Sequence, residues 1–373
     1  MRVLIAPDKF AGTLTAPEAA AAIAAGWARR APHDELDLAP MSDGGPGFVD
    51  VLHAATGGEL AAVTVGGPYA EQVPATVLVA GDTAYVESAQ ACGRHLTEHG
   101  GDPEGASSYG VGELLLAARD AGARTIVVGL GGSGTTDGGA GLLAALGATA
   151  DRPLDRGCAG LAGVSRVDLA AARAAVEGLA LVGASDVDNP LTGLFGAAKT
   201  YGPQKGIAEE RLPAVDAVLE EWAVATDRRT ALEKGAGAAG GLGFALLLLG
   251  ARREPGIGLV AEQVDLAARA RKADLVVTGE GAFDFSSRSG KVPYGVAQVA
   301  ADALRPCVAL AGQVLVGARE MRALGVESAY AMVDAVGEER SFTDPHGALA
   351  DLAERVARTW STGWSGGSGR LGE

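Results

Sequence analysis

The sequence predicts an α/β protein of two domains, in which a mixed α/β domain is inserted into a parallel-sheet domain built from both chain ends. The length of 373 residues favours two domains over one. Both ends alternate apolar strand-like runs with helix-like runs, which is typical of a parallel sheet. Between about residues 60 and 88 the runs are short, β-rich and separated by turns, which is typical of antiparallel strands. We therefore assign 1–60 and 265–373 to the first domain and 61–264 to the insertion.

The first domain begins with a predicted strand over residues 2–6 and a helix that extends to Arg30. Thr15 has the character of an N-cap, Pro17 falls in the first turn, and Glu18 stands where a capping box requires an acid. A second strand is expected at 36–40 and a second helix at 46–56.

The insertion is predicted to contain hairpins at Gly66-Gly67 and Gly81-Asp82, where glycine permits tight turns. Further along we expect helices at 110–122 and 211–226 and strands at 125–130 and 179–184.

The last third returns to alternating elements. Strands are predicted at 273–279, 307–312 and 328–333, and helices at 292–304, 317–324 and 346–360.

Composition excludes several classes of protein. The formal net charge of −15 argues against a nucleic-acid partner. Three scattered cysteines, Cys92, Cys158 and Cys307, favour neither a disulfide framework nor a zinc site. The apolar run FALLLLGA is far shorter than the ~20 residues of a membrane span, and MRVLIAPDKF lacks the features of a signal peptide. We therefore expect a cytoplasmic protein.

Glycine is enriched, at 56 residues, and gathers with Ser, Thr, Asp and Asn where apolar runs end. In an open α/β sheet, ligands bind outside the carboxyl ends of the strands. Six segments have this position or begin a helix, and they are the candidate ligand loops: 7–13, 42–45, 131–139, 185–190, 201–206 and 278–284.

The 131–139 segment has the composition of an anion-binding loop. Small residues such as Gly132 leave backbone N–H groups accessible, and a helix begins directly behind them. Ser133 and Thr135 add hydroxyl donors. The alternative is a tight strand-to-helix turn that binds nothing.

Two stretches match the spacing of a dinucleotide fingerprint. Gly129-x-Gly131-x-x-Gly134 follows a strand, so a nicotinamide oxidoreductase is one hypothesis, although no acid ends a second strand at the required place. In the second match, Gly237 and Gly240 follow helix-like sequence, so we expect them to open the next helix, with a possible phosphate role.

Phosphoryl transfer requires a group that orients the attacking alcohol, cations that spread the phosphate charge, and a carboxylate for Mg²⁺. Asp186 and Asp188 are candidates for the base and a metal ligand, or else form an Asx turn that ends a strand. Lys205 and Lys291 are candidate phosphate cations, or else solvated surface lysines. Glu280 and Asp284 suit Mg²⁺ or hydroxyl groups, or else favour a helix dipole. The sequence contains no P-loop and no protein-kinase signature.

Taken together, these segments resemble the bacterial glycerate kinase family of the glycerate 2-kinase type. The opening VLIAPDKFAGT resembles IAPDSFKGS, residues 41–47 resemble ADGGEG, residues 108–113 resemble TYGTGE, and residues 131–141 resemble GGSATNDGGAG. DVDNP at 186–190 and GAGAAGGLG at 235–243 match outright, while 201–206 resemble FGPQKG and 278–293 resemble TGEGRID…GKVP. The matches follow one another in order from residue 2 to about 312.

The resemblance implies ATP-dependent phosphorylation of D-glycerate, usually at the 2-hydroxyl, with Mg²⁺, in a cleft between a flavodoxin-like domain and the inserted domain. It places in matched motifs the candidate catalytic residues Asp186, Asp188, Lys205 and Lys291. It also places there the candidate binding residues Asp8, Lys9, Asp43, Gly132, Ser133, Thr135, Asp137, Asn189, Gly237, Gly240, Glu280 and Asp284, the last two also as metal ligands. We expect D-glycerate and ATP as partners, no nucleic acid or membrane, and a monomer or homodimer.

Some positions depart from the family pattern. Ala11 stands where the family often has Lys, Pro46 replaces Glu, and Ala282 replaces Arg. Gly134 replaces Ala, Thr136 replaces Asn, and 90–93 differ from the usual AEASG-like stretch. These changes motivate two alternatives, a kinase of a related small hydroxy acid and a binding protein of this family that has lost turnover.

Overall fold

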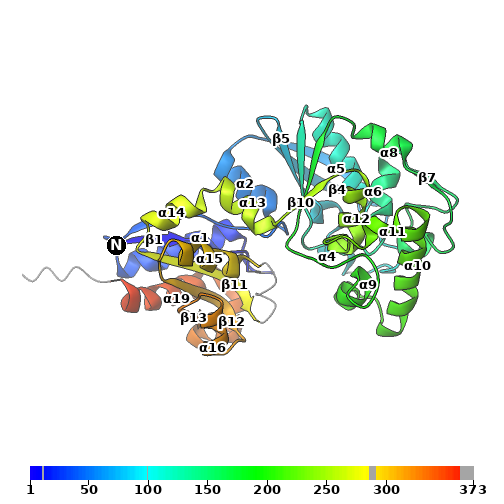
Figure 1. Ribbon diagram of the computed structural model, residues 1–373. Coiled ribbons are helices and arrows are strands. Elements are labelled where there is room, and N and C mark those ends of the chain that lie inside the picture. Colours follow the sequence, from blue (N-terminus) through cyan, green and yellow to red (C-terminus); the bar gives the residue numbers. More distant parts are fainter. Residues whose placement is uncertain (11, 99, 285–290, 362–373) are drawn as a thin grey trace, which may run out of the picture. The chain divides into compact units, whose positions relative to one another are not determined.

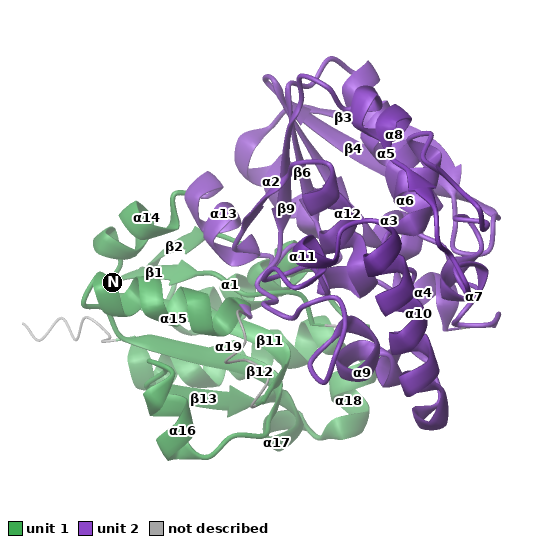
Figure 2. Cartoon of the chain, turned by 45° about the vertical axis from the view of Figure 1, so that its right-hand side comes forward, with its two compact units in different colours: residues 1–41, 265–288, 292–373 green, residues 42–264, 289–291 purple. Residues whose placement is uncertain are grey.

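The computed structural model describes residues 1–10, 12–98, 100–284 and 291–361, and these form two compact units (Figures 1 and 2). Unit 1 comprises 1–41, 265–288 and 292–373, and unit 2 comprises 42–264 and 289–291. The division follows Met41, whereas the sequence analysis placed it after residue 60. Helix α2 (Phe48–Thr56) belongs to unit 2 because Phe48 packs edge-to-face on Tyr85 of the unit 2 sheet, with ring centroids 6.2 Å apart.

Unit 1 contains a five-stranded, fully parallel sheet of order β13-β12-β11-β1-β2. In chain order this is the 2-1-3-4-5 arrangement of flavodoxin-like folds, and the order reverses between β1 and β11. The strands are β1 (Arg2–Ile5), β2 (Glu35–Leu38), β11 (Leu275–Phe283), β12 (Cys307–Val314) and β13 (Ser328–Ala331). The predicted parallel sheet from both chain ends is confirmed.

Helices cover both faces of this sheet. Alternate residues of β1 point to opposite faces, and Val3 and Ile5 pack in one core with Trp27 of α1 and Leu349 of α19. Helix α15 packs on β11 from outside this core and covers the other face. The helices are α1 (Ala16–Arg30), α14 (Leu266–Lys272), α15 (Val292–Asp302), α16 (Ala318–Ala323), α17 (Met332–Val336), α18 (Glu338–Thr343) and α19 (Pro345–Trp360).

The start of α1 confirms the predicted capping box. The Glu18 amide donates to Thr15 Oγ1 at 3.3 Å, and Glu18 Oε2 accepts from the Thr15 amide at 2.8 Å. Two donors that the first turn leaves without helical partners are thereby satisfied.

Unit 2 contains a six-stranded mixed sheet of order β10-β9-β6-β5-β4-β3. β5, β6, β9 and β10 run parallel, and two antiparallel hairpins add β4 and β3. The second predicted hairpin is confirmed, since Gly81-Asp82 joins Ala80 to Thr83. The strands are β3 (Glu59–Gly66), β4 (Gln72–Ala80), β5 (Thr83–Glu87), β6 (Thr125–Gly129), β9 (Ala180–Ala184) and β10 (Arg252–Glu254), with a separate pair β7 (Thr149–Ala150) and β8 (Val167–Asp168).

The core of unit 2 lies between one face of this sheet and a helical layer that includes α5 (Tyr109–Asp120), α6 (Ala140–Ala145), α10 (Leu212–Ala225) and α12 (Leu242–Leu248). Trp222 and Phe244 are fully buried there. Short helices connect the rest: α3 (Ala89–Cys92), α4 (Arg94–Thr97), α7 (Gly157–Gly160), α8 (Ala170–Ala175), α9 (Ala197–Tyr201), α11 (Arg228–Ala231), α13 (Gly256–Gln263), and the 3₁₀ turns η1 (Pro203–Lys205), η2 (Glu209–Arg211) and η3 (Ala238–Gly241).

One predicted loop is a strand. The sequence analysis ended a strand at residue 279, but β11 continues to Phe283, where Phe283 pairs with Val314 of β12. Glycine permits this pairing at close range, because a Cβ on Gly312 would lie 2.4 Å from the Gly281 carbonyl oxygen. Glu280 therefore projects from a strand, not from a loop.

Candidate functional site

Three polar loops of unit 2 meet where the parallel strands β6 and β9 end. The Gly131 amide donates to the Gly44 carbonyl at 3.0 Å, which joins the loop after β6 to the 42–47 loop. A Cβ on Gly44 would lie 2.9 Å from the carbonyl oxygen of Ala184, the last residue of β9. The side chains that follow these strands are thus brought together, as expected for the ligand edge of such a sheet.

Asp186 lies at the start of α13, on the side of the 42–47 loop. Its Oδ2 accepts from the Ile257 amide at 3.2 Å. A Cβ on Gly256 would lie 2.2 Å from the Asp43 carbonyl oxygen and 3.2 Å from Asp186 Oδ2, so only glycine fits between the two. Burial raises the pKa of Asp186 to about 7, the Ile257 amide opposes the rise, and the Asp43 charge adds to it.

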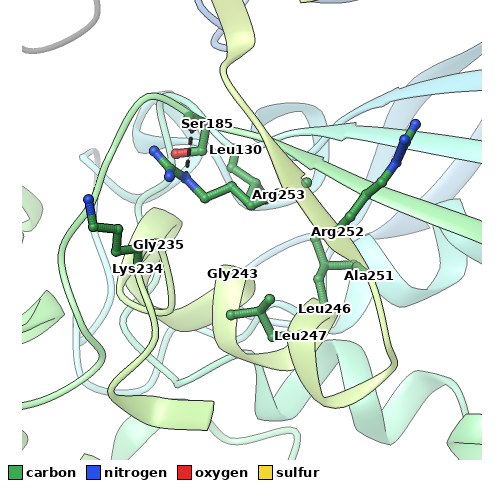
Figure 3. Close-up of a pocket in the computed structure, with 11 residues that line it drawn as sticks. Leu130, Ser185, Lys234, Gly235, Gly243, Leu246, Leu247, Ala251, Arg252 and Arg253 are labelled. Carbon is green, nitrogen blue, oxygen red and sulfur yellow. Dashed lines mark hydrogen bonds between the residues drawn. The ribbon is translucent and has the colours of Figure 1, made fainter.

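Asp188 has the opposite environment. Its carboxylate is exposed and pairs with Arg253 at 2.7 Å and with Lys234 at 3.1 Å. The hydrogen bond from Lys234 is the main cause that holds the pKa of Asp188 below its usual value. Figure 3 shows Lys234 and Arg253 beside Ser185, whose carbonyl accepts from Arg253 Nε at 3.1 Å. Two carboxylates two residues apart therefore differ in proton affinity, and Asp186 is the one suited to accept a proton near neutral pH.

Lys205 is buried against the loop that follows β6. Its Nζ donates to Ser133 Oγ at 2.9 Å and to the Thr135 carbonyl at 2.6 Å. Only 7% of the residue is exposed. Burial lowers the pKa of Lys205 to about 8. The sequence alternative of a solvated surface lysine is wrong.

Asp137 is fully buried and organises the loop. Its carboxylate accepts hydrogen bonds from the Ser108 amide and hydroxyl and from the amides of Gly139 and Gly141, at 2.8 to 3.2 Å. Burial nevertheless raises its pKa. These contacts favour a positioning role for Asp137 over direct ligand contact.

The predicted amide cradle at 131–139 is partly used by the protein itself. The amides of Gly131, Gly134 and Gly138 donate to the carbonyls of residues 44, 92 and 240. Three of the amides expected to form the cradle are therefore engaged within the protein. The hydroxyls of Thr135 and Thr136 are buried and have no hydrogen-bond partner within the described chain.

The predicted glycines and Asn189 hold loops together. A Cβ on Gly240 would lie 1.9 Å from the Thr135 carbonyl oxygen and 2.9 Å from Lys205 Nζ. Gly132 packs on Pro46, and Gly237 packs on Pro190 and donates to the Asn189 carbonyl. The Asn189 side chain donates to the Phe195 carbonyl at 2.7 Å and accepts from the Tyr201 hydroxyl at 3.0 Å.

The remaining candidates lie mostly in unit 1, at its β1/β11 edge. The Asp8 amide donates to the Gly279 carbonyl at 2.8 Å, which places Asp8 and Lys9 beside Glu280 at the carboxyl ends of neighbouring strands. Asp8 and Glu280 are 6% and 5% exposed. Asp284 follows β11 directly, and Lys291 groups with unit 2. Ala11 lies outside the described residues.

A crevice of about 230 Å³ opens next to this edge in unit 1. Phe10, Ala282, Gly312, Met332 and Phe342 are among its lining residues. Its position outside the ends of β11 and β12 is where open α/β sheets bind ligands.

The chain matches the glycerate kinase family over residues 3–361. It belongs to the glycerate kinase family. Its similarity to the glycerate kinase of Halalkalibacterium halodurans is 38% identity, covering 89% of this chain and 90% of that one. Similarity to the glycerate 2-kinase of Escherichia coli is 34% identity, covering 97% and 99%. A crystal structure from Salmonella typhimurium LT2 that carries the name glycerate kinase 2 superposes with a TM-score of 0.78 at 34% identity, covering 97% and 99%.

Membership of this kinase family confirms the resemblance seen in the sequence. Some departures from the family motifs lie in packing contacts within the protein, and others line a crevice. Pro46 packs on Gly132, and Ala282 lines the unit 1 crevice. Cys92, Cys158 and Cys307 are free and buried.

The described residues contain neither a metal-binding cluster of side chains nor a membrane-spanning helix. Within that part of the chain, no three His, Cys, Asp or Glu side chains are grouped to hold a metal ion. No helix there is long and apolar enough to cross a bilayer.

Several residues at the ligand edge were not found from the sequence. Glu87 ends β5, is 6% exposed, and accepts from the Gly47 amide at 2.9 Å. The rule applied to other loops, that a polar residue follows an apolar strand, would have identified Glu87 as well. Arg253 and Lys234 give no such signal, because each is an ordinary charged residue until the fold sets it beside Asp188.

Proposed function

We propose that this protein is an ATP-dependent kinase of D-glycerate. The observation that carries the proposal beyond family membership is the contrast between Asp186 and Asp188. One carboxylate is half-buried with a pKa raised to about 7, and the other is paired with two cations. A base with a pKa near the working pH is what activation of an alcohol requires.

In the proposed step, a glycerate hydroxyl oxygen attacks the γ-phosphorus of ATP. The new bond joins that oxygen to phosphorus, the bond from phosphorus to the β,γ-bridging oxygen breaks, and ADP leaves. Asp186 takes the hydroxyl proton. We assign the 2-hydroxyl as the acceptor, by analogy with the glycerate 2-kinase named above.

Lys205 and Lys291 are proposed to offset phosphate charge during the step. Mg²⁺, when bound, spreads the negative charge of the triphosphate. Glu280 and Asp284 are the residues proposed to hold it, since Mg²⁺ takes one or two carboxylates together with phosphate oxygens. Glu280 projects from β11 and Asp284 follows its last residue, so each can offer one carboxylate, and a three-ligand protein cluster is not required. Asp43 is the alternative ligand from unit 2.

Cytoplasmic location and a monomeric or homodimeric state are part of the same proposal. The net charge of −15 supports an enzyme of small molecules over a nucleic-acid-binding protein.

A coupled assay of ADP release with D-glycerate and MgATP tests the function, and ³¹P NMR of the product separates 2-phosphoglycerate from 3-phosphoglycerate. We expect turnover that requires both substrates. Absence of turnover above background over a range of pH and divalent metals would rule the proposal out.

A second candidate is a kinase of a related small hydroxy acid, favoured by Ala282 and Pro46. Ala282 lines the unit 1 crevice where the family motif has Arg, so a cation is missing at a ligand edge. A panel of 2- and 3-hydroxy acids decides between the two: D-glycerate as the acceptor with the highest kcat/KM dismisses this candidate.

A further inference from the structure

Lys205 is a buried cation that forms no ion pair with a described residue, although the Asp137 carboxylate favours its charged form from a greater distance. An ammonium has three N–H donors, and Lys205 Nζ donates to two neutral oxygens, Ser133 Oγ and the Thr135 carbonyl. No carboxylate among the described residues lies within ion-pair distance of Lys205 Nζ, and the hydrogen bonds of Asp137 are to amides and a hydroxyl. A buried charge without an ionic partner is costly.

A second cation stands over the same loop. Arg94 begins the short helix α4, and its amide donates to the Gly132 carbonyl at 3.0 Å. Its neighbour Thr97 packs against the loop as well, since a Cβ on Gly134 would lie 2.3 Å from Thr97 Oγ1. Backbone contacts therefore fix α4 against the residues that hold Lys205.

Arg94 and Lys205 line one crevice of about 390 Å³ in unit 2, together with Thr97, Gln204 and Glu98. Arg94 is exposed and forms no ion pair with any described residue. Burial is the main cause that lowers the pKa of Lys205, and the charge of Arg94 adds a smaller lowering. Like charges on residues that line one crevice repel each other, and an anion bound between them would offset that repulsion. Arginine and lysine are also the side chains that proteins use for carboxylate and phosphate.

We infer that Arg94 and Lys205 form a binding site for one oxyanion group of a substrate, with Arg94 as a specificity-determining residue. The group is a carboxylate of the hydroxy acid or a phosphate of the nucleotide, which share this chemistry. The inference rests on the proposed function for the identity of the substrates, but not for the existence of the anion site.

The test compares Arg94→Ala and Arg94→Lys with the wild type in the full-length protein. Arg166→Ala is the matched control, because Arg166 is an arginine of unit 2 whose side chain is 85% exposed. Titration calorimetry with inorganic phosphate and with D-glycerate, at constant ionic strength, measures anion binding directly. Steady-state kinetics measure KM separately for D-glycerate and for ATP.

We expect Arg94→Ala to weaken anion binding about tenfold or more, as loss of a charged hydrogen bond does, while Arg166→Ala does not change it. A rise in KM for D-glycerate alone identifies the carboxylate as the bound group, and a rise for ATP alone identifies a phosphate. Arg94→Lys keeps the charge but loses the planar guanidinium, so its affinity for the anion should lie between those of the wild type and Arg94→Ala.

Arg94→Ala indistinguishable from Arg166→Ala in calorimetry and in both KM values would overturn the inference. A wild type that binds phosphate but does not phosphorylate D-glycerate would instead remove the proposed function and leave the anion site standing. Lys205→Met adds a separate check: if its far-UV circular dichroism is native, phosphate binding must be lost, and retained binding also overturns the site.

Discussion

At the scale of single residues, environment decides the chemistry more than identity does. Asp186 and Asp188 are the same side chain after the same strand. Asp186 is half-buried and accepts from the Ile257 amide at the start of α13, whereas Asp188 is exposed and paired with Lys234 and Arg253. Before the structure, either one was an equal candidate for the base. The difference in their partners now ranks Asp186 first.

We predict that Asp186→Asn lowers kcat about 100-fold or more, as removal of a general base does. Asp188→Asn, its matched control from the same loop, should change kcat much less, since Asp188 is occupied by two cations. Rates from the coupled ADP assay check both, after circular dichroism shows that each variant is folded. A larger loss for Asp188→Asn than for Asp186→Asn would reverse the assignment.

The pH dependence of kcat/KM follows from the same environments. Asp186 accepts a proton only when ionised, so activity should rise as pH increases through about 7. Lys205 holds an anion only when protonated, so activity should fall as pH increases through about 8. We expect a narrow bell-shaped profile, because kcat/KM reports the free enzyme.

The profile can be assigned to residues by substitution. Lys205→Arg should move the alkaline limb to higher pH, because a guanidinium stays protonated throughout this range. An alkaline limb that stays at the wild-type pH in an active Lys205→Arg variant would show that another group controls it.

At the scale of elements, glycine loops determine how closely the strand ends and their loops approach one another. The 235–243 stretch opens a helix as predicted, since Gly241 is the N-cap of α12. Its phosphate role stays a prediction, and its glycines are needed because they touch backbone. Gly240 has φ +70° and faces the Thr135 carbonyl that holds Lys205. The loop therefore affects Lys205 by positioning the Thr135 carbonyl.

Gly240→Ala should therefore destabilise the protein and reduce turnover together. Gly178→Ala is the matched control: Gly178 has φ +79°, but a Cβ there meets nothing within 4 Å. The control should lose only the cost of a left-handed alanine, about 1–2 kcal/mol, and keep its kcat. Urea unfolding and kcat measured on both variants check this, and equal effects would contradict the steric argument.

At the scale of the whole molecule, the two units differ in how the chain builds them. Unit 2 draws almost entirely on one continuous stretch, 42–264, which has its own core around Trp222 and Phe244. Unit 1 needs both chain ends, because α1 and α19 pack together in its core. Independent folding is therefore expected of unit 2 alone.

We predict that a fragment of residues 42–264 folds cooperatively by itself, seen as a single thermal transition in circular dichroism. It should have no kinase activity, because Asp8, Glu280 and Asp284 are missing. A fragment of residues 1–264, which has only one of the two ends of unit 1, should leave 1–41 sensitive to protease. Noncooperative unfolding of 42–264 would show that unit 2 depends on unit 1.

The sequence by itself determined the family, the alternation of elements and the split parallel sheet. The periodicity of apolar residues and the helix caps involve only residues close together in the sequence. The Thr15 capping box is an example, formed by residues three positions apart. The sequence also selected the loops that hold Asp186 and Lys205, since each lies in a glycine-containing segment near the end of an element. These features need no knowledge of which segments touch.

Only the tertiary structure decided what each polar residue does. In the folded protein Lys205 is buried and lines the same crevice as Arg94. Asp137 accepts four hydrogen bonds. Asp188 pairs with two cations from distant parts of the chain. Burial and charge pairing act through space between residues far apart in sequence, and they set proton affinity and ligand access. Local pattern carries no record of those distances, so the candidate residues could be named from it, but their roles could not.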